Sequence, residues 1–574
     1  MIRGVSSRRG SGTVLPVVVV LVTLMGTVAE PAFGMPTKPR SDDGVSASAP
    51  TPRPTRKSVS VVPVGVDGLT RALESGRVSE AQYSLQRAAS LFALQDVRAR
   101  YGRVLRSDPR LATLVLRDLA IRIHQLSGAE RKRGLAILAR PDAGVGADPD
   151  GYSVPSEVTC STNVCLHWVE TSLDAPPPED VDLSGFPDWV ETTAGVLEDI
   201  WQKEVVEYGY RPPKSDLTST GHGPDGRLDV YLADVGDDGL FGYCTTDDPD
   251  LLDGIYPPYD GSAYCVLDND FSAAQFGTRS SGLIGLRVTA AHEFFHAIQF
   301  SFDALEDLWF MESTAMWMED EVFDNLNNNR LYLPTSSMVQ GDVPIDYGRG
   351  FFIYGNWIFI RFLTEYFGSR AAGDPSVVRE AWELADGSLV GPDHYSMQAL
   401  AQIARERRSD LSWAFADFGA FNLAPKRFYE EGSAYRTPRI DKSFGMTAAK
   451  SDTGPSTVRT DHMTNRYISF RPGRGIGSTA KLALGVDAPP ARIGPQATAV
   501  VFFRSGAVRF FPFRLNAHGD AVRRVPFGRG SVRNVVLVLT NASTRFRCWL
   551  GSIYSCQGRP RDDNQRYLFR AVAT

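Results

Sequence analysis

The sequence predicts a chain of several domains: a helical N-terminal unit, a central domain of mixed α and β structure, and a C-terminal all-β sandwich. The chain has 574 residues, too many for one ordinary hydrophobic core. Apolar residues recur at helical spacing in its first part, strands and helices mix in the middle, and short strands separated by turn residues fill the last part. The formal net charge of −6 does not suggest nucleic acid as a partner.

The N-terminus has the layout of a secretory signal. Arg3, Arg8 and Arg9 precede an apolar run over 14–25, and small residues then lead to Gly34. This order predicts a signal peptide over residues 1–34 and a secreted, extracellular protein. A membrane anchor is the alternative, but the run is short for a span, so no stable span is expected after signal removal. The choice between Sec and twin-arginine export stays open.

Two segments separate the signal from the central domain. Residues 35–60 are rich in Pro, Ser, Thr and charge, which predicts a disordered linker. Residues 61–142 have helical periodicity, and their position before the central domain suggests a propeptide. The mature protein is then expected to begin between Arg140 and Ser156. A permanent N-terminal domain is the alternative.

Two pairs of residues in this helical unit have the spacing of helix-start signals. Ser79 precedes Gln82 by three positions, and Ser127 precedes Glu130 by the same interval. Both pairs predict a capping box, in which each side chain accepts a hydrogen bond from the other residue's backbone.

Cysteine usage agrees with export. The six cysteines are an even number, and all lie downstream of the predicted signal. In an exported chain this favours disulfides; fifteen connectivities are possible for six cysteines, and we favour the local pairs. A zinc site built on cysteine is the alternative, but C-x-x-C spacing is missing. The predicted pairs are Cys160 with Cys165, Cys244 with Cys265, and Cys548 with Cys556.

The central domain is expected over residues 151–450. Its first half reads as a strand, a long amphipathic helix and two further strands. These elements are expected at 165–171, 187–208, 227–234 and 262–267. Its second half, after a pair of apolar helices, is mostly helical.

Acidic loops in this domain make calcium a second candidate cofactor. Asp234, Asp237 and Asp238 lie close together in the sequence, and Asp268 and Asp270 form a smaller group. Carboxylate oxygens are the ligands that calcium prefers. Aspartate is also an ordinary turn residue, so turns alone are the alternative.

The segment His292-Glu293-Phe294-Phe295-His296 matches H-E-x-x-H inside an apolar helix predicted over 282–302. Residues four apart lie on one face of a helix, so His292 and His296 can bind one metal ion. Glu293 lies about 100° round the helix, where it can reach a water on that metal without binding the metal itself. This is the pattern of a zinc-peptidase site.

A second apolar helix supplies the remaining acidic residues. Glu312 follows His296 by sixteen positions and lies among Phe, Met and Ala, which makes it the candidate third zinc ligand. Glu319 lies seven residues further on, on the same face. It either accepts a hydrogen bond from a ligand imidazole or forms the exposed end of the helix; the spacing allows both.

The combined motif, H-E-x-x-H followed by W-x-x-E-x-x-A-x-x-x-E, resembles the gluzincin metallopeptidases. Within them it looks most like the hyicolysin-like and related bacterial secreted enzymes. The resemblance is close over 288–321 and looser over 165–368. The spacing to the third ligand is slightly shorter than in thermolysin, which leaves the subfamily open. The matching residues are His292, Glu293, His296, Trp309, Glu312, Ala315 and Glu319.

This resemblance implies a zincin fold, in which the last strand lies beside the site and can pair with an extended substrate. It implies zinc held by His292, His296 and Glu312, and hydrolysis of peptide bonds by a zinc-activated water with Glu293 as general base. A G-x-M-E-N exopeptidase motif is missing, which favours an endopeptidase made as a zymogen.

A tyrosine is expected to stabilise the oxyanion of the reaction, because enzymes of this kind often place a Tyr or His there. Tyr354, at the start of an apolar helix, is the candidate, and Tyr347 is the reserve. A packed aromatic side chain is the alternative for Tyr354.

The last predicted domain, residues 455–574, is a β-sandwich that either binds a substrate or surface or supports the protease. Short strands are expected in it at 467–470, 481–486, 498–504, 508–515, 535–540 and 567–572. For the whole chain we expect a monomer that acts on proteins or peptides. A secreted, non-catalytic binding or adhesion protein that keeps a zincin scaffold is the alternative.

Overall fold

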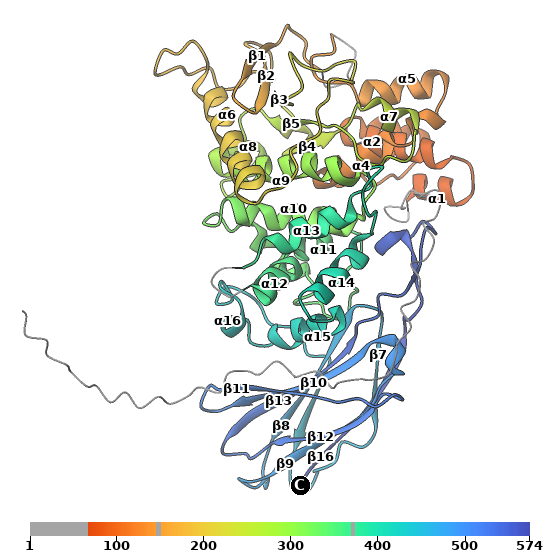
Figure 1. The fold of residues 1–574 in the computed structure, drawn as a ribbon, viewed down its shortest axis with the longest axis vertical. Helices are drawn as coiled ribbons and strands as arrows, with labels where there is room; N and C mark the ends of the chain where they lie inside the picture. Colours follow the sequence, from red (N-terminus) through yellow and green to blue (C-terminus); the bar gives the residue numbers. More distant parts are fainter. Residues whose placement is uncertain (1–66, 145–150, 369–372) are drawn as a thin grey trace, which may run out of the picture. The chain divides into compact units, whose positions relative to one another are not determined.

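The computed structural model describes residues 67–144, 151–368 and 373–574 (Figure 1). These residues belong to one unit of mutually contacting segments, 56–574. The predicted signal peptide and linker, residues 1–34 and 35–60, lie outside the described residues.

The N-terminal part of the described chain is helical. Its helices are α1 (Gly68–Glu74), α2 (Glu80–Phe92), α3 (Leu94–Tyr101), α4 (Ala112–Ala120) and α5 (Gly128–Ile137). The capping box of Ser79 and Gln82 is present in both directions.

The second predicted capping box is wrong. Ser127 makes no side-chain cap hydrogen bond. Glu130 instead accepts hydrogen bonds from the side-chain Nε2 of Gln82, at 3.2 and 3.0 Å. This bond joins α2 to α5, a long-range contact that local spacing cannot reveal.

A five-stranded sheet follows, with the strand order β1-β2-β3-β5-β4. Neighbouring strands β2, β3 and β5 run parallel, whereas β1 and β4 are antiparallel edge strands. The bounds are β1 (Glu157–Cys160), β2 (Val164–Trp168), β3 (Leu228–Ala233), β4 (Gly242–Thr245) and β5 (Tyr264–Asp268). The sequence predicted β2, β3 and β5 but missed both edge strands, because four residues are too few to show an alternating pattern.

The edge position of β4 corrects one expectation. The last strand before the H-E-x-x-H helix, β5, lies between β3 and β4 and pairs with both. Among the described strands, the one with an unpaired edge beside the candidate site is therefore β4, which the sequence did not predict.

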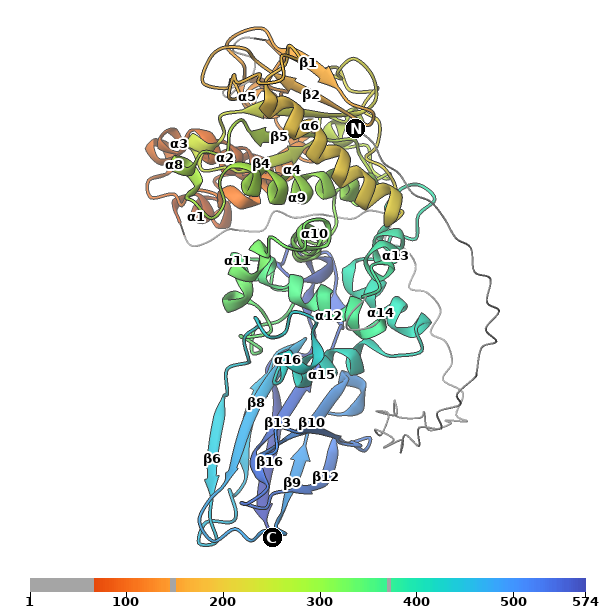
Figure 2. The same cartoon turned by 90° about the vertical axis from the view of Figure 1, so that its left-hand side faces the viewer.

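Helices cover both faces of this sheet. On one face lie α6 (Asp188–Trp201), which continues as a π-helical turn over Gln202–Glu207, and α9 (Gly282–Asp303). On the other face, Tyr231, Tyr243 and Tyr264 share a hydrophobic core with α2 and α4. Figure 2 shows α4 beside β4 and α9. The short helices α7 (Pro249–Asp253) and α8 (Ala273–Phe276) lie in the loops around β5.

The second half of the central region is helical and built around α10 (Leu308–Val322), which packs against α9. Its core contains four fully buried tryptophans, Trp309, Trp317, Trp357 and Trp382. The remaining helices are α11 (Phe351–Gly355), α12 (Trp357–Phe367), α13 (Ser376–Ala385), α14 (Ser396–Glu406), α15 (Leu411–Phe421) and α16 (Pro425–Phe428).

The C-terminal region is all β. Its two larger sheets have the orders β11-β10-β13-β8-β6 and β12-β9-β16-β7, and they share one hydrophobic core, as in a sandwich. Six predicted strands are present, whereas β6, β7 and β12 were missed; β6 precedes the expected start of the domain. The bounds are β6 (Lys442–Met446), β7 (Ser456–Thr460), β8 (Thr464–Pro472), β9 (Lys481–Asp487), β10 (Pro495–Phe503), β11 (Val508–Pro512), β12 (Asp520–Pro526), β13 (Val532–Asn541) and β16 (Gln565–Ala573). A small sheet pairs β14 (Phe546–Arg547) with β15 (Arg559–Pro560).

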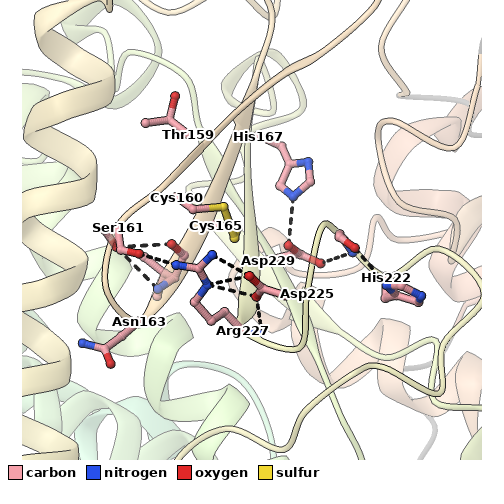
Figure 3. Close-up of a disulfide and its surroundings, with 12 residues drawn as sticks. Thr159, Cys160, Ser161, Asn163, Cys165, His167, His222, Asp225, Arg227 and Asp229 are labelled. Atoms are coloured by element: carbon pink, nitrogen blue, oxygen red, sulfur yellow. Dashed lines mark hydrogen bonds and ion pairs between the residues drawn. A yellow bond between two sulfur atoms is a disulfide. The ribbon is translucent and has the colours of Figure 1, made fainter.

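The three predicted local disulfides are confirmed. Cys160–Cys165 joins β1 to β2 (Figure 3), and Cys244–Cys265 joins β4 to β5. Among the described residues, helices of the length and hydropathy needed to cross a bilayer are absent.

A buried histidine links the C-terminal region to the helical half. His462 contacts Asp346 through Nε2 at 2.9 Å and Asp563 through Nδ1 at 2.6 Å. Burial alone would lower its pKa, but the two carboxylates together raise the pKa of His462 to about 10. Asp346 also accepts a hydrogen bond from the backbone N–H of Ser555.

The contribution of His462 to stability is predicted to fall as pH rises. Below pH 6.5 the imidazole is charged in both the folded and the unfolded chain, so the ion pairs contribute fully. Between 6.5 and about 10 only the folded chain holds the proton, and the contribution is lost. Replacing His462 by Gln should cost about 3–5 kcal/mol at pH 6 and much less at pH 10. Thermal unfolding at both pH values measures this, with exposed His518→Gln as control; a pH-independent difference would contradict it.

Candidate metal centre

His292, His296 and Glu312 come together where α9 crosses α10. Their candidate ligand atoms all lie within 4.8 Å of one another, and all three residues are buried. The two histidines lie on one face of α9, as four-residue spacing requires. α10 brings Glu312 opposite them, with its Oε2 3.2 Å from Nε2 of His292. The three residues predicted as metal ligands therefore form one cluster.

Both imidazoles are oriented through their Nδ1 atoms. Nδ1 of His292 lies 2.8 Å from Oε1 of Glu319, and Nδ1 of His296 lies 2.7 Å from Oε1 of Gln299. The Gln299 amide is fixed in turn, because it donates to the Met311 carbonyl at 2.9 Å. A carboxylate or amide acceptor on Nδ1 leaves Nε2 as the ligand atom. Glu319 thus contacts a ligand imidazole, one of the two roles its spacing allowed.

The remaining polar atoms of the cluster fit a zinc ion. Nε2 of His296 and Oε1 of Glu312 lie 3.8 Å apart in the interior, and neither has a hydrogen-bond partner among the described residues. Buried polar atoms of this kind are costly unless something binds them. Two imidazole nitrogens and one carboxylate are the donor set of a catalytic zinc site with one open position.

Burial dominates the electrostatics of the cluster. It raises the pKa of both Glu312 and Glu319, and it lowers the pKa of His296 well below the usual range, helped by the neighbouring His292. Burial also lowers the pKa of His292, but its hydrogen bonds to the two glutamates outweigh this and raise that pKa overall.

Glu293 lies on α9 next to the cluster, but its carboxylate is outside the group of ligand atoms. It is buried, with 6% of its surface exposed. Burial raises the pKa of Glu293 to about 7. Its Oε2 accepts a hydrogen bond from the hydroxyl of Thr113, in α4, at 2.8 Å.

Tyr354 reaches the centre from α11. Its ring centroid lies 6.3 Å from that of His292. Within the described part of the chain its buried hydroxyl has no hydrogen-bond partner, and burial raises the pKa of Tyr354 well above its usual value. The reserve candidate, Tyr347, contacts Phe352 and Tyr554 instead. The structure therefore brings Tyr354, and not Tyr347, to the cluster.

Sequence reasoning missed three polar residues at this centre: Gln299, Tyr332 and Thr113. Gln299 could have been found, because a buried amide three residues after His296 lies on the same helix face. Tyr332 contacts Tyr354, with ring centroids 5.3 Å apart, but it lies in a short 3-10 segment without periodicity. Thr113 is distant in sequence, and only the tertiary structure brings it to Glu293.

The acidic loops expected to bind calcium have protein partners in the structure. Asp238 pairs with Arg106 at 2.8 Å, and the side chain of Gln275 donates to both Asp234 and Asp237. Asp268 accepts backbone hydrogen bonds, including one from Gly236 at 2.7 Å. Asp270 accepts from the backbone of Ser272.

A different acidic loop brings carboxylates together. The candidate ligand atoms of Asp180, Asp182 and Asp188 lie within 4.8 Å of one another, just before and at the start of α6. The segment from Asp180 to Glu191 has the spacing D-x-D-x-S-G-x-x-D-x-x-E, which differs from an EF-hand loop in its fifth residue. Sequence reasoning overlooked this spacing. Calcium binding stays a prediction.

Comparisons with known proteins add little. Family models give no match, and neither do curated proteins. Among solved structures, the chain is similar to the pre-peptidase C-terminal domain of a collagenase from Bacillus anthracis, at 11% identity and a TM-score of 0.13, over 24% of this chain and 97% of that one. It is also similar to a family GH115 4-O-methyl-α-glucuronidase, at 9% identity and a TM-score of 0.13, over 64% of this chain and 53% of that one. TM-scores this low support no conclusion about fold or function.

Removing the carboxylate behind His292 should weaken metal binding. We predict that Glu319→Ala lowers zinc affinity about 10–100-fold, because the imidazole loses the acceptor that orients it. Competition with a chromophoric zinc chelator measures the affinity. Glu406→Ala, an exposed change at the end of α14, is the control. An affinity within about twofold of wild type would contradict the assigned role.

Proposed function

We propose that the protein is a secreted, zinc-dependent endopeptidase that is made as a zymogen. The observation that carries this proposal is the convergence of His292, His296 and Glu312, with the Glu293 carboxylate beside them. The resemblance of the same residues to the gluzincin motif agrees with it. Three disulfides and the predicted signal peptide support export.

In this proposal His292, His296 and Glu312 hold the zinc, and Glu319 and Gln299 keep the two imidazoles in place. A bound zinc ion supplies a Lewis acid that polarises the scissile carbonyl and acidifies water. Glu293 takes a proton from the attacking water and delivers it to the leaving amine, a role that suits a carboxyl group with a pKa near neutrality.

Tyr354 is the proposed donor to the developing oxyanion. Its hydroxyl has no protein partner to lose, and the ring lies beside His292. A donor held in a buried site contributes most when it need not reorganise during the reaction.

The edge of β4 is the proposed place for the substrate backbone. β4 pairs on one side with β5, and among the described strands none pairs with its other side, which is where an extended peptide can add. The backbone N–H of Cys244 donates to the Thr113 side chain rather than to a strand. This N–H therefore points away from β5, at the open edge of the sheet. Recognition through backbone groups suits an enzyme that cuts within polypeptides.

Glu293→Gln should abolish hydrolysis but keep the zinc. The amide cannot accept the proton, and general-base catalysis is typically worth about 10²–10⁴-fold in rate. Casein hydrolysis and metal content of the secreted, processed protein measure the two effects. If wild type and variant both hold zinc and are equally inert, the non-catalytic binding protein becomes the better description.

Tyr354→Phe should lower kcat by about 10²-fold without changing the zinc content, because it removes one donor to the oxyanion. Cleavage of a quenched fluorescent peptide by processed protein gives kcat and KM. Tyr347→Phe serves as the matched control and should behave like wild type. Unchanged kcat in Tyr354→Phe would exclude the proposed role.

A further inference from the structure

We propose that the N-terminal helical unit is a latch that inhibits the enzyme through its general base and its substrate strand, not through its metal ligands. Thr113 makes the decisive contacts. This inference rests on the proposed peptidase function and specifies how the same site is regulated. It predicts that the inhibited chain already holds zinc.

The Thr113 hydroxyl joins two groups that catalysis would need. It donates to Oε2 of Glu293 at 2.8 Å and accepts from the backbone N–H of Cys244 at 2.9 Å. Only 2% of Thr113 is exposed, so water does not compete for these bonds. One side chain thus engages the proposed base and the outward-facing N–H of β4 together.

The rest of α4 excludes a substrate from the same place. Leu114, in the first turn of α4, and Ile121, directly after its last residue, are buried in the hydrophobic core of the central domain. Between them, Arg117 donates from Nη1 to the Glu306 carbonyl at 3.2 Å and contacts Met311 Sδ at 3.2 Å. Because α4 packs along β4, a peptide cannot pair with that strand while the helix is in place.

The metal ligands do not depend on the latch. The hydrogen-bond partners of His292 and His296 are Glu312, Glu319 and Gln299, which all lie on α9 or α10. Burial is the main cause of the raised pKa of Glu312, and the Asp108 carboxylate of the helical unit adds to it. Asp108, however, caps the turn that precedes α4 by accepting from the backbone of Arg110, and it is outside the group of ligand atoms.

Buried ion pairs hold the latch in place at its other end. Arg140, with 2% of its surface exposed, pairs with Asp216 at 2.6 Å, with Asp247 at 2.8 Å and with Asp229. Figure 3 shows His167 directed at the same Asp229, at 2.9 Å. Removing one partner from such a network leaves buried charges without compensation. A chain cut after Arg140 would keep all these contacts, so release requires the unit to dissociate.

The test compares full-length chains that carry Thr113→Glu or Thr113→Ser. A glutamate would place a second carboxylate beside Glu293, and the repulsion should displace α4, whereas serine keeps the hydroxyl. Three quantities are measured: zinc per chain, hydrogen exchange of the peptides over 112–120 and 242–245, and hydrolysis of a quenched peptide library. Unchanged exchange over 532–541 confirms that the fold is intact.

We expect one zinc per chain in all three proteins, protected exchange and slow hydrolysis in wild type and Thr113→Ser, and faster exchange with at least tenfold faster hydrolysis in Thr113→Glu. Equal exchange in wild type and Thr113→Glu would overturn the latch. Zinc in Thr113→Glu but not in wild type would overturn the claim that the ligands stay available. Faster exchange without hydrolysis in any protein would support the latch and contradict the peptidase function.

If Thr113→Glu does not fold, Arg140→Met gives the same readouts from the other end of the unit. Arg140→Met should also speed hydrogen exchange over 112–120. The outcomes named for Thr113→Glu then support or overturn the latch in the same way.

Discussion

The cost of burying ionisable groups constrains this structure more than any other interaction. α9 and α10 are apolar helices in the middle of the chain, yet they bury two histidines and three glutamates. Such groups persist in an interior only when each has a partner. Glu319 and Gln299 satisfy the outer nitrogens of the imidazoles, and the inner atoms face one another in the geometry of a metal site.

The cost of burying ionisable groups also connects the N-terminal helical unit to the candidate metal centre. Glu293 is buried beside α4, and the hydroxyl of Thr113 is the partner that its carboxylate requires in that state. Three tyrosines on the opposite face of the sheet are also buried by this unit. The helical unit therefore contributes both to the hydrophobic core of the sheet and to the polar environment of the candidate site.

The core of the C-terminal sandwich depends on hydrophobic packing rather than on partners for buried ionisable groups. Its two sheets bury their own apolar faces against each other, and β10 and β13 are buried on their opposite face as well. Its link to the helical half is polar at His462 and its two carboxylates, and apolar where Ala420 and Leu423 pack against Val500, Val536 and Val538 of β10 and β13. The stability of this junction therefore depends on hydrophobic packing as well as on the protonation of His462.

The sequence by itself determined the features that depend on residues close together in the chain. Helical spacing placed His292, Glu293 and His296 on one helix, apolar neighbours indicated a buried Glu312, and close spacing identified the disulfide pairs. Only the tertiary structure decided which strand forms the sheet edge, that Glu319 contacts His292, and that Thr113 contacts Glu293. The reason is physical: these features join residues up to 180 positions apart, so no local pattern records them. They depend on how separate elements pack.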